Sequence, residues 1–276
     1  MPLEFHKMHG AGNDFVLLDL RQQNFELNAQ HAALMADRHR GIGCDQILVL
    51  KEAQDAENTA RYEIWNSDGS RAGQCGNGAR CIALYLRIND GIGDGVFSLE
   101  SPCGRIRLQS CEDGEFEAEM GVPDFEPANL PIKLSPQDGL YHLPSPWGRL
   151  EIGAVSMGNP HALMLTNDIT DQEFPEKAVF VGSHEVFPEG CNVGIAQIED
   201  RARILLRVIE RGAGETLACG SGACAAVAIL RRSGRVDDVV NVLLPGGHLV
   251  IKWPGDWQQL KMKGPADYVF KGKLNG

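Results

Sequence analysis

Two cysteines in nearly identical settings are the residues of this chain best suited to chemistry. One lies in Gln74-Cys75-Gly76-Asn77-Gly78-Ala79 and the other in Ala218-Cys219-Gly220-Ser221-Gly222-Ala223. The copies stand 144 residues apart (219 − 75) in a chain of 276 residues. A run of small and apolar residues, typical of a buried helix, follows each copy. The repeat therefore predicts two equivalent thiols at two helix N-termini that serve one site.

A helix N-terminus changes the chemistry of a thiol placed there. Unpaired backbone N–H groups and the helix dipole attract anions. They can lower the pKa of a cysteine from about 8.5 to roughly 3.5–7.5. We therefore expect thiolate character at Cys75 and Cys219. The backbone groups expected to bind a substrate carboxylate belong to Gly76, Asn77, Gly220 and Ser221.

This pairing predicts removal and return of a proton at the α-carbon of a carboxylate substrate. Charge that develops in the enediolate would fall where N–H donors already point, which is usually the largest catalytic contribution. Cys75 and Cys219 would act as thiolate base and thiol acid on opposite faces, and so invert the centre without a cofactor. Two alternatives remain. Both cysteines could be structural, or they could form a disulfide that marks an oxidised, inactive state.

The other six cysteines lack the repeated setting. We interpret all six as buried structural residues: Cys44, Cys81, Cys103, Cys111, Cys191 and Cys224. For Cys44 and Cys191 a place beside the pocket is the alternative. The absence of a Cys-x-x-Cys pair argues against a zinc ribbon or a thioredoxin-like site. We expect no disulfide framework in so long a chain without a secretion signal, and no metal site.

The repeat extends beyond the cysteines. Asn13 and Asn159 are separated by 146 residues (159 − 13), Gln46 and Asn192 by 146 (192 − 46), and Asn66 and Glu210 by 144 (210 − 66). Landmarks that recur in one order at nearly one spacing indicate two homologous halves. Each half is predicted to be a strand-rich layer around one buried helix.

Local patterns supply the elements of these halves. Alternating apolar residues predict half-buried strands at 62–65, 105–108, 116–120, 205–209 and 249–253. Helices are predicted at 28–39, 79–87 and 223–232. The proline-rich segment 121–136 lies near the middle of the chain, where a domain boundary belongs. The fold class expected is α/β.

The composition excludes several classes of binding partner. The net charge is −11 and the pI about 5.2, which argues against a nucleic-acid or anionic-membrane surface. The sequence contains no apolar stretch long enough for a membrane span, and its first residues lack the apolar core of a signal peptide. We expect a soluble cytoplasmic protein that acts on a small molecule.

The motifs together resemble the diaminopimelate epimerase family over the whole chain. The matching segments are 7–15, 41–46, 66–70, 73–80, 158–161, 210–216 and 218–222. The resemblance implies a cofactor-independent isomerase of lysine and peptidoglycan precursor synthesis that interconverts LL- and meso-diaminopimelate. It also implies two pseudo-symmetric α/β halves with strands curled around a central helix, a site in the cleft between them, and a homodimer.

The resemblance also implies domain limits and residue roles. Residues 1–120 and 265–276 would form the half that carries Cys75, and residues 121–264 the half that carries Cys219. The distal carboxylate of the substrate would be held by Asn66, Asn159, Asn192 and Arg211. Glu210 would help to hold the distal ammonium, and Asn13 and Gln46 would line the pocket near the reacting centre. By resemblance, Cys75 is the base for the LL isomer.

Chemistry supports a fixed set of residues that recognises the distal end, because only one end of this doubly zwitterionic substrate inverts. Arg211 could bind a carboxylate bidentately. His161 could steer a proton or simply hydrogen-bond in the core. Tyr268 could be a packing or an interface aromatic. Two rival functions remain: a racemase of proline or hydroxyproline, and a non-catalytic protein for amino-acid binding or thiol redox chemistry.

Overall fold

The chain forms two compact units in a computed structural model that describes residues 2–73 and 75–274. Gln74, in the first cysteine motif, and the last two residues of the predicted segment 265–276 lie outside the described residues. The first unit runs to Glu119 and resumes at Lys263, and the second is Met120–Met262. The domain limits expected above, as limits of independent domains, stay a prediction.

The first unit is a mixed sheet with two helices. Its elements are β1 (Leu3–Gly10), β2 (Asn13–Asp19), α1 (Ala29–Ala36), β3 (Gln46–Lys51), β4 (Ala60–Asn66), β5 (Arg71–Ala72), α2 (Gly76–Asp90), β6 (Val96–Ser101), β7 (Gly104–Ser110), β8 (Phe116–Glu119) and β18 (Asp267–Leu274). Paired strands give the order β18-β1-β2-β3-β4-β6-β7-β8, with β5 beside β4. The pairs β2–β3 and β4–β6 are parallel, as a helical crossover between their strands requires.

The second unit repeats this plan. Its elements are β9 (Tyr141–Ser145), β10 (Gly148–Ser156), β11 (Pro160–Leu165), α3 (Phe174–Ser183), β12 (Asn192–Asp200), β13 (Arg203–Glu210), β14 (Gly214–Thr216), α4 (Gly220–Arg232), β15 (Val239–Leu244) and β16 (Gly247–Lys252). The order is β9-β10-β11-β12-β13-β15-β16, with β14 beside β13 and parallel pairs at β11–β12 and β13–β15. The predicted α/β fold of two similar halves is confirmed. The division between the units falls inside β17 (Lys261–Gly264).

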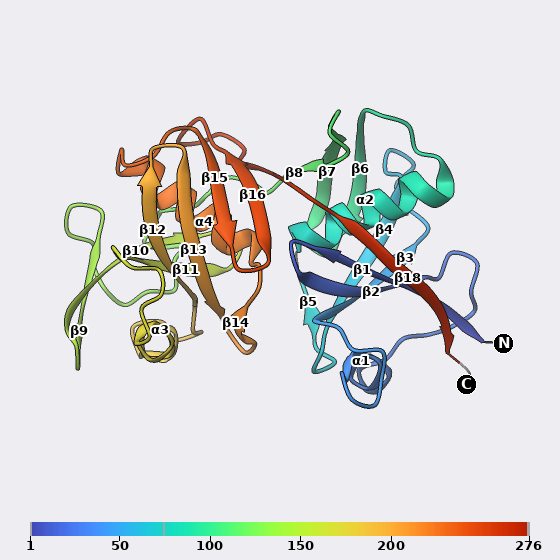
Figure 1. Cartoon of the computed structure of the whole chain (residues 1–276), viewed down its shortest axis with the longest axis horizontal. Helices are drawn as coiled ribbons and strands as arrows, with labels where there is room; N and C mark the ends of the chain where they lie inside the picture. The colour runs from blue at the N-terminus through green and yellow to red at the C-terminus, as the bar shows by residue number, and fades with distance from the viewer. Residues whose placement is uncertain (1, 74, 275–276) are drawn as a thin grey trace. The chain divides into compact units, whose positions relative to one another are not determined.

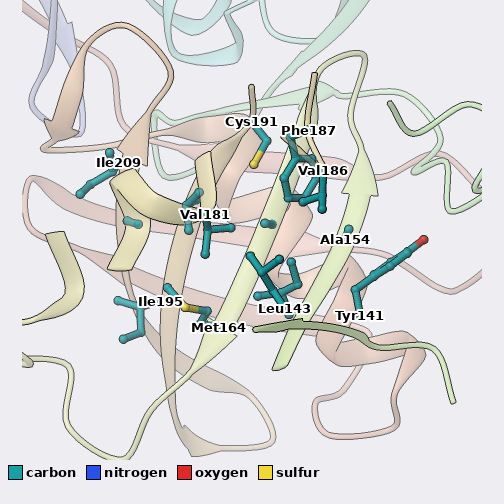
Figure 2. Packing of buried hydrophobic residues seen from close by; sticks show 14 of the residues in the cluster. Tyr141, Leu143, Ala154, Met164, Val181, Val186, Phe187, Cys191, Ile195 and Ile209 are labelled. Carbon is teal, nitrogen blue, oxygen red and sulfur yellow. The ribbon is translucent and has the colours of Figure 1, made fainter. Parts of the chain in front are cut away.

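Each sheet carries a helix on both faces. In the first unit, Val16 and Ile47 belong to the core that contains Ala32 and Met35 of α1. Their strand neighbours, such as Leu48, face α2 instead, since successive side chains of a strand point to opposite faces. The closeness of Leu48 to α2 is evident at Gly78, where an added side-chain carbon would lie 2.9 Å from Leu48 Cδ2. Strands buried on both faces carry continuous apolar runs rather than alternating ones. Figure 2 shows the corresponding core of the second unit beside α3.

The two long helices are enclosed by strands. In Figure 1, α2 lies among the strands of the first unit, and it contacts β1, β2, β3, β7, β8 and β18. Helix α4 contacts β10, β11, β12, β13 and β16. Such burial explains why both sequences are apolar nearly all round. The long last strand, β18, runs beside β1 in the same picture and pairs with it antiparallel.

The helices begin and end where backbone groups find partners. Both long helices start three residues before the predicted 79 and 223, because each cysteine side chain caps the glycine-rich turn. Helix α2 stops at Gly91, which adopts the left-handed conformation with φ 67°. Helix α1 is shorter than the predicted 28–39. Asn28 is its N-cap and accepts a hydrogen bond from His31 N–H at 2.8 Å. No helix among the described residues is long and apolar enough to cross a membrane.

Candidate functional site

Cys75 is the N-cap of α2, as the motif predicts. Its backbone is extended (φ −145°, ψ 106°), and Sγ accepts the N–H of Gly78 at 3.4 Å. The Cys75 thiol donates to Asn13 Oδ1 at 3.7 Å. Gly76 and Asn77 are the first two residues of the helix, and N–H groups of a first helical turn point away from the helix body. A partly exposed thiol therefore lies beside the amides expected to bind a carboxylate.

Asn13 connects this thiol to a wider polar network in the first unit. Its Oδ1 also accepts from Asn77 Nδ2 at 3.2 Å, and its Nδ2 donates to Asp45 Oδ2 at 2.9 Å. Asp45 also accepts from Arg38 at 2.8 Å. The orientation of the Asn13 amide is thus fixed from both ends. Sequence reasoning missed Asp45 as a partner of Asn13.

Gln46 and Asn66 form the second polar pair of this unit. Gln46 begins β3 and Asn66 ends β4, and the two residues lie directly opposite each other in the sheet. Gln46 Nε2 donates to Asn66 Oδ1 at 2.9 Å, while Asn66 Nδ2 donates to Ser70 Oγ at 2.9 Å. The structure therefore brings these two predicted site residues together.

Cys219 caps α4 in the same way as Cys75 caps α2. Sγ accepts the N–H of Gly222 at 3.4 Å, and Ser221 Oγ lies 3.6 Å from it. Gly220 and Ser221 are the first residues of α4 and offer the equivalent N–H groups. Cys219 is only 4% exposed, however, whereas Cys75 is partly exposed.

The expected lowering of the Cys219 pKa is wrong in this structure. Burial raises the pKa of Cys219 well above its ordinary value, and the Glu210 carboxylate beside it raises it further. Hydrogen bonds from Ser221 and Gly222 act in the opposite direction but are smaller effects. Desolvation of a fully buried thiolate outweighs the helix N-terminus, so Cys219 rests as a thiol. Glu210 itself accepts from Thr216 Oγ1 at 2.6 Å.

The strand ends of the second unit carry the remaining polar residues. Asn159 directly precedes β11, and a hydrogen bond of 3.1 Å joins its Oδ1 to His161 Nε2. His161 is buried and lies opposite Asn192 in the parallel pair β11–β12. Burial lowers the pKa of His161 from 6.5 to about 3, so its ring is neutral near pH 7. The hydrogen bond to Asn159 accounts for one ring nitrogen of His161, and its role in steering a proton stays a prediction.

Arg211 is exposed at the turn after β13 and is tied to its own unit. Its backbone N–H donates to Asn192 Oδ1 at 2.9 Å, and Nη1 donates to the Glu189 carbonyl at 2.5 Å. One edge of the guanidinium therefore has a protein partner. The predicted neighbours Asn192, Glu210 and Arg211 do meet at one end of the β12–β13 pair.

Arg80 is a polar residue of the site region that sequence reasoning missed. It is completely buried within α2, and its guanidinium donates to Asn77 Oδ1 at 2.8 Å. It also donates to the carbonyls of Gly76 at 3.4 Å and Pro265 at 3.3 Å. A charged residue in the first half of the helix, directly before the apolar run that begins at Cys81, was the signal that could have found it.

The cysteines outside the motif divide into two groups. All eight cysteines are free thiols, and Cys44, Cys81, Cys191 and Cys224 are buried as expected. Burial raises the pKa of Cys44 and of Cys191 to about 12. The expectation that Cys103 is buried is wrong, because the tight β6–β7 turn exposes it; Cys111 is only partly buried.

Tyr268 packs against His6, and their hydrogen bond is 2.9 Å long.

Comparison with known proteins gives the same family as the motifs. The family model for diaminopimelate epimerase matches residues 5–126 and 153–269. The chain is 48% identical over 275 residues to the diaminopimelate epimerase of Xanthomonas campestris pv. campestris, with 99% of this chain and 96% of that protein covered. It is 45% identical over 276 residues to that of Xylella fastidiosa, with 100% and 97% covered.

Solved structures with low sequence identity share the fold. A hydroxyproline epimerase from Agrobacterium vitis with bound trans-4-OH-L-proline matches with a TM-score of 0.74 at 15% identity, over 99% of this chain and 92% of that one. A phenazine biosynthesis protein of the PhzF family from Bacillus anthracis matches with a TM-score of 0.69 at 15% identity, over 100% and 99%. With the motifs and the family match taken together, this chain belongs to the diaminopimelate epimerase family and is an isomerase.

Proposed function

We propose that this protein interconverts LL- and meso-diaminopimelate in lysine and peptidoglycan precursor synthesis, with Cys75 and Cys219 as its two proton-transferring groups. The observation that carries the proposal is the equivalent placement of the two thiols. Each is the N-cap of the central helix of its unit, and each accepts an N–H three residues later at 3.4 Å. A reaction that exchanges base and acid when it runs backwards needs such a matched pair.

The chemistry proceeds by proton transfer alone. One thiolate removes the α-proton and the electron pair passes into the substrate carboxylate. The other thiol then gives its proton to the opposite face of the same carbon. The amides of Gly76, Asn77, Gly220 and Ser221 stabilise the enediolate charge. Cys75, partly exposed, acts as the base toward the LL isomer, and the buried Cys219 supplies the proton.

Polar residues outside the motif supply the specificity. In the repeat, Gln46 of the first unit is equivalent to Asn192 of the second, and Asn66 is equivalent to Glu210. The two units therefore carry different polar side chains around similar cysteine motifs. The end of the substrate that does not react is bound by five residues: Asn66, Asn159, Asn192, Glu210 and Arg211. Asn13 and Gln46 line the reacting end, and Asn159 is oriented by His161. A substrate without a distal ammonium and carboxylate would leave these groups unpaired.

Isotope exchange tests the proposal. The reduced protein is incubated with LL-diaminopimelate in deuterium oxide without pyridoxal phosphate. We expect deuterium at one α-carbon together with meso product, and we expect inversion to be lost in both Cys75→Ala and Cys219→Ala. Cys224→Ala, a buried cysteine of the same helix as Cys219, is the matched control and keeps exchange.

The same experiment separates the rival functions. Faster turnover of L-proline than of LL-diaminopimelate would favour the proline-type racemase. Binding of either amino acid without exchange by fully reduced protein would leave a binding or thiol-redox protein and exclude the proposal.

A further inference from the structure

Two equivalent asparagines of the repeat are held by opposite ends of their side-chain amides. Asn13 begins β2, and Asn159 directly precedes β11, the equivalent strand of the second unit. A side-chain amide offers an acceptor at Oδ1 and two donors at Nδ2, so its orientation decides which kind of group it binds. The hydrogen-bond partners of Asn13 and Asn159 determine these orientations.

In the first unit, Asn13 belongs to a chain of hydrogen bonds that has only one possible direction. Arg80, which can only donate, gives a hydrogen bond to Asn77 Oδ1 at 2.8 Å. Asn77 Nδ2 donates to Asn13 Oδ1 at 3.2 Å, and Asn13 Nδ2 donates to Asp45 Oδ2 at 2.9 Å. A carboxylate can only accept. A donor at one end and an acceptor at the other therefore orient both amides between them.

The Asp45 carboxylate is itself held by other groups. Arg38 donates to its Oδ1 at 2.8 Å, and the backbone N–H of Asp14 donates to its Oδ2 at 3.1 Å. The Asp45 backbone N–H donates in return to Asp14 Oδ1 at 3.0 Å. The side chain of Asp45 is 40% exposed, so its replacement leaves no cavity in the core. The oxygen that accepts from Asn13 thus has a defined position at the surface of the unit.

This orientation turns the oxygen of Asn13 toward the first cysteine. Asn13 Oδ1 accepts the Cys75 thiol at 3.7 Å. An amide turned the other way would present Nδ2 donors, which stabilise a thiolate but accept neither an S–H proton nor an ammonium proton. The carboxylate behind Asn13 therefore decides whether the site offers an acceptor or a donor beside Cys75.

In the second unit, the equivalent amide is held by its oxygen. Asn159 Oδ1 lies 3.1 Å from His161 Nε2, and this nitrogen carries the proton because an amide oxygen can only accept. The ring is neutral near pH 7, since burial lowers its pKa. The donors of Asn159 Nδ2 therefore point away from His161. The residue equivalent to Asp45 is Cys191 (45 + 146), so a thiol stands where the first unit has the carboxylate.

We propose that Asp45, held by Arg38, is a positioning residue that makes Asn13 an acceptor at the reacting end of the substrate. The equivalent Asn159 is a donor at the other end. This inference rests on the function proposed above and deepens it. The acceptor suits the ammonium group on the reacting carbon, and the donor suits the distal carboxylate. One duplicated position thus recognises groups of opposite charge in the two units.

Alkylation of Cys75 tests the orientation of Asn13 without substrate. The reduced protein reacts with iodoacetamide at about pH 7, and peptide mass spectrometry measures the rate at Cys75. In Asp45→Ala the amide loses its acceptor and can turn its donors toward the thiolate. We expect a rate about threefold or more above that of Asp45→Asn, since hydrogen bonds to the charged form of a group favour that form.

Asp45→Asn is the matched control for the lost charge. Its oxygen stays where Asn13 Nδ2 and the Asp14 N–H both need an acceptor, so the orientation of Asn13 is kept. Circular dichroism checks the folding of each variant. If Asp45→Ala does not fold, Asp45→Leu takes its place, because leucine has nearly the shape of aspartate and offers no acceptor.

A double-mutant cycle shows whether Asp45 acts through Asn13. In an Asn13→Ala background there is no amide to turn, so Asp45→Ala and Asp45→Asn should give equal rates at Cys75. An Asp45 that only stabilises its turn would cause the same difference in both backgrounds. Equal rates in the presence of Asn13, or a difference that persists without it, would overturn the inference.

Isotope exchange with LL-diaminopimelate gives the second readout. Exchange should fall about 10-fold or more in Asp45→Ala and be largely kept in Asp45→Asn, because a misplaced group at the reacting centre is costly. Asp55→Ala, at an exposed carboxylate of the same unit that pairs with Arg105, should exchange like the wild type. Absent exchange in the wild type, with alkylation rates as expected, would count against the proposed function and not against this role of Asp45.

Discussion

Identical motifs place two sulfur atoms in matching backbone settings but in different surroundings. Cys75 is partly exposed and contacts a neutral amide, whereas Cys219 is 4% exposed and stands beside a carboxylate. The thiol pKa responds to burial and to neighbouring charge as well as to the helix N-terminus. The motif therefore predicts where the sulfurs lie, and the neighbours predict which of them holds a proton.

His161 links the site to the pH dependence of stability. Its pKa falls from 6.5 in the unfolded chain to about 3 in the fold, because burial disfavours the charged ring. The unfolded state therefore binds the proton first, and the stabilisation is complete above pH 6.5 and lost as the pH falls toward 3. Between pH 7 and pH 5 the contribution to the free energy of unfolding should decrease by about 2 kcal/mol.

Urea unfolding at the two pH values measures this effect. In His161→Gln the decrease between pH 7 and pH 5 should be about 2 kcal/mol smaller than in the wild type. His39→Gln, at an exposed position after α1, controls for the loss of one histidine. Equal pH dependence in His161→Gln and the wild type would show that His161 is not kept neutral by the fold.

At the scale of elements, a tight glycine turn determines the position of the Cys219 sulfur. A side-chain carbon at Gly222 would lie 3.2 Å from Cys219 Sγ and 3.1 Å from Val208 Cγ2. Val208 is part of β13, so a methyl group at this position would require the strand or the sulfur to shift by a few tenths of an ångström. The glycine is needed for packing and for placement of the thiol at once.

Gly222→Ala should therefore separate activity from stability. We expect exchange of the substrate α-proton to fall roughly 10- to 100-fold, because small displacements of a reacting group are costly. The free energy of unfolding should change by no more than about 1 kcal/mol, since alanine also favours the helix. Gly93→Ala is the matched control, because its side chain would meet nothing within 4 Å. Full activity in Gly222→Ala would contradict this account.

Element patterns in the sequence are informative where burial is one-sided. Alternation finds β7, whose Ile106 and Leu108 face inward between exposed residues. It is less informative for β3, which is buried on both faces and carries the unbroken run Ile47–Leu50. The sequence pattern predicts that the helices after Cys75 and Cys219 begin three residues later than they do, since glycines are poor helix formers until a cap fixes them.

At the scale of the whole molecule, the family resemblance predicts a homodimer. The last strand offers one surface for it, because Val269 and Phe270 of β18 are 52% and 47% exposed. Burial of exposed apolar side chains on an outer strand would stabilise such a contact. Sedimentation velocity should show a dimer for the wild type and a monomer for Val269→Lys. Val96→Lys, at a residue that is 54% exposed on β6, should remain dimeric. A Val269→Lys protein that sediments like the wild type would place the interface elsewhere.

The repeat, the two helix N-termini with their cysteines, and the polar residues at equivalent offsets can all be predicted from the sequence. These follow from spacing, because a duplicated fold keeps its landmarks in one order. The charge around each thiol cannot be predicted in this way, because it depends on how the chain folds. Arg80 reaches Asn77 and Pro265, which is 185 residues away in sequence, and Glu210 reaches Cys219 across a strand turn. Burial and distant neighbours set a pKa, and neither can be seen in a local motif.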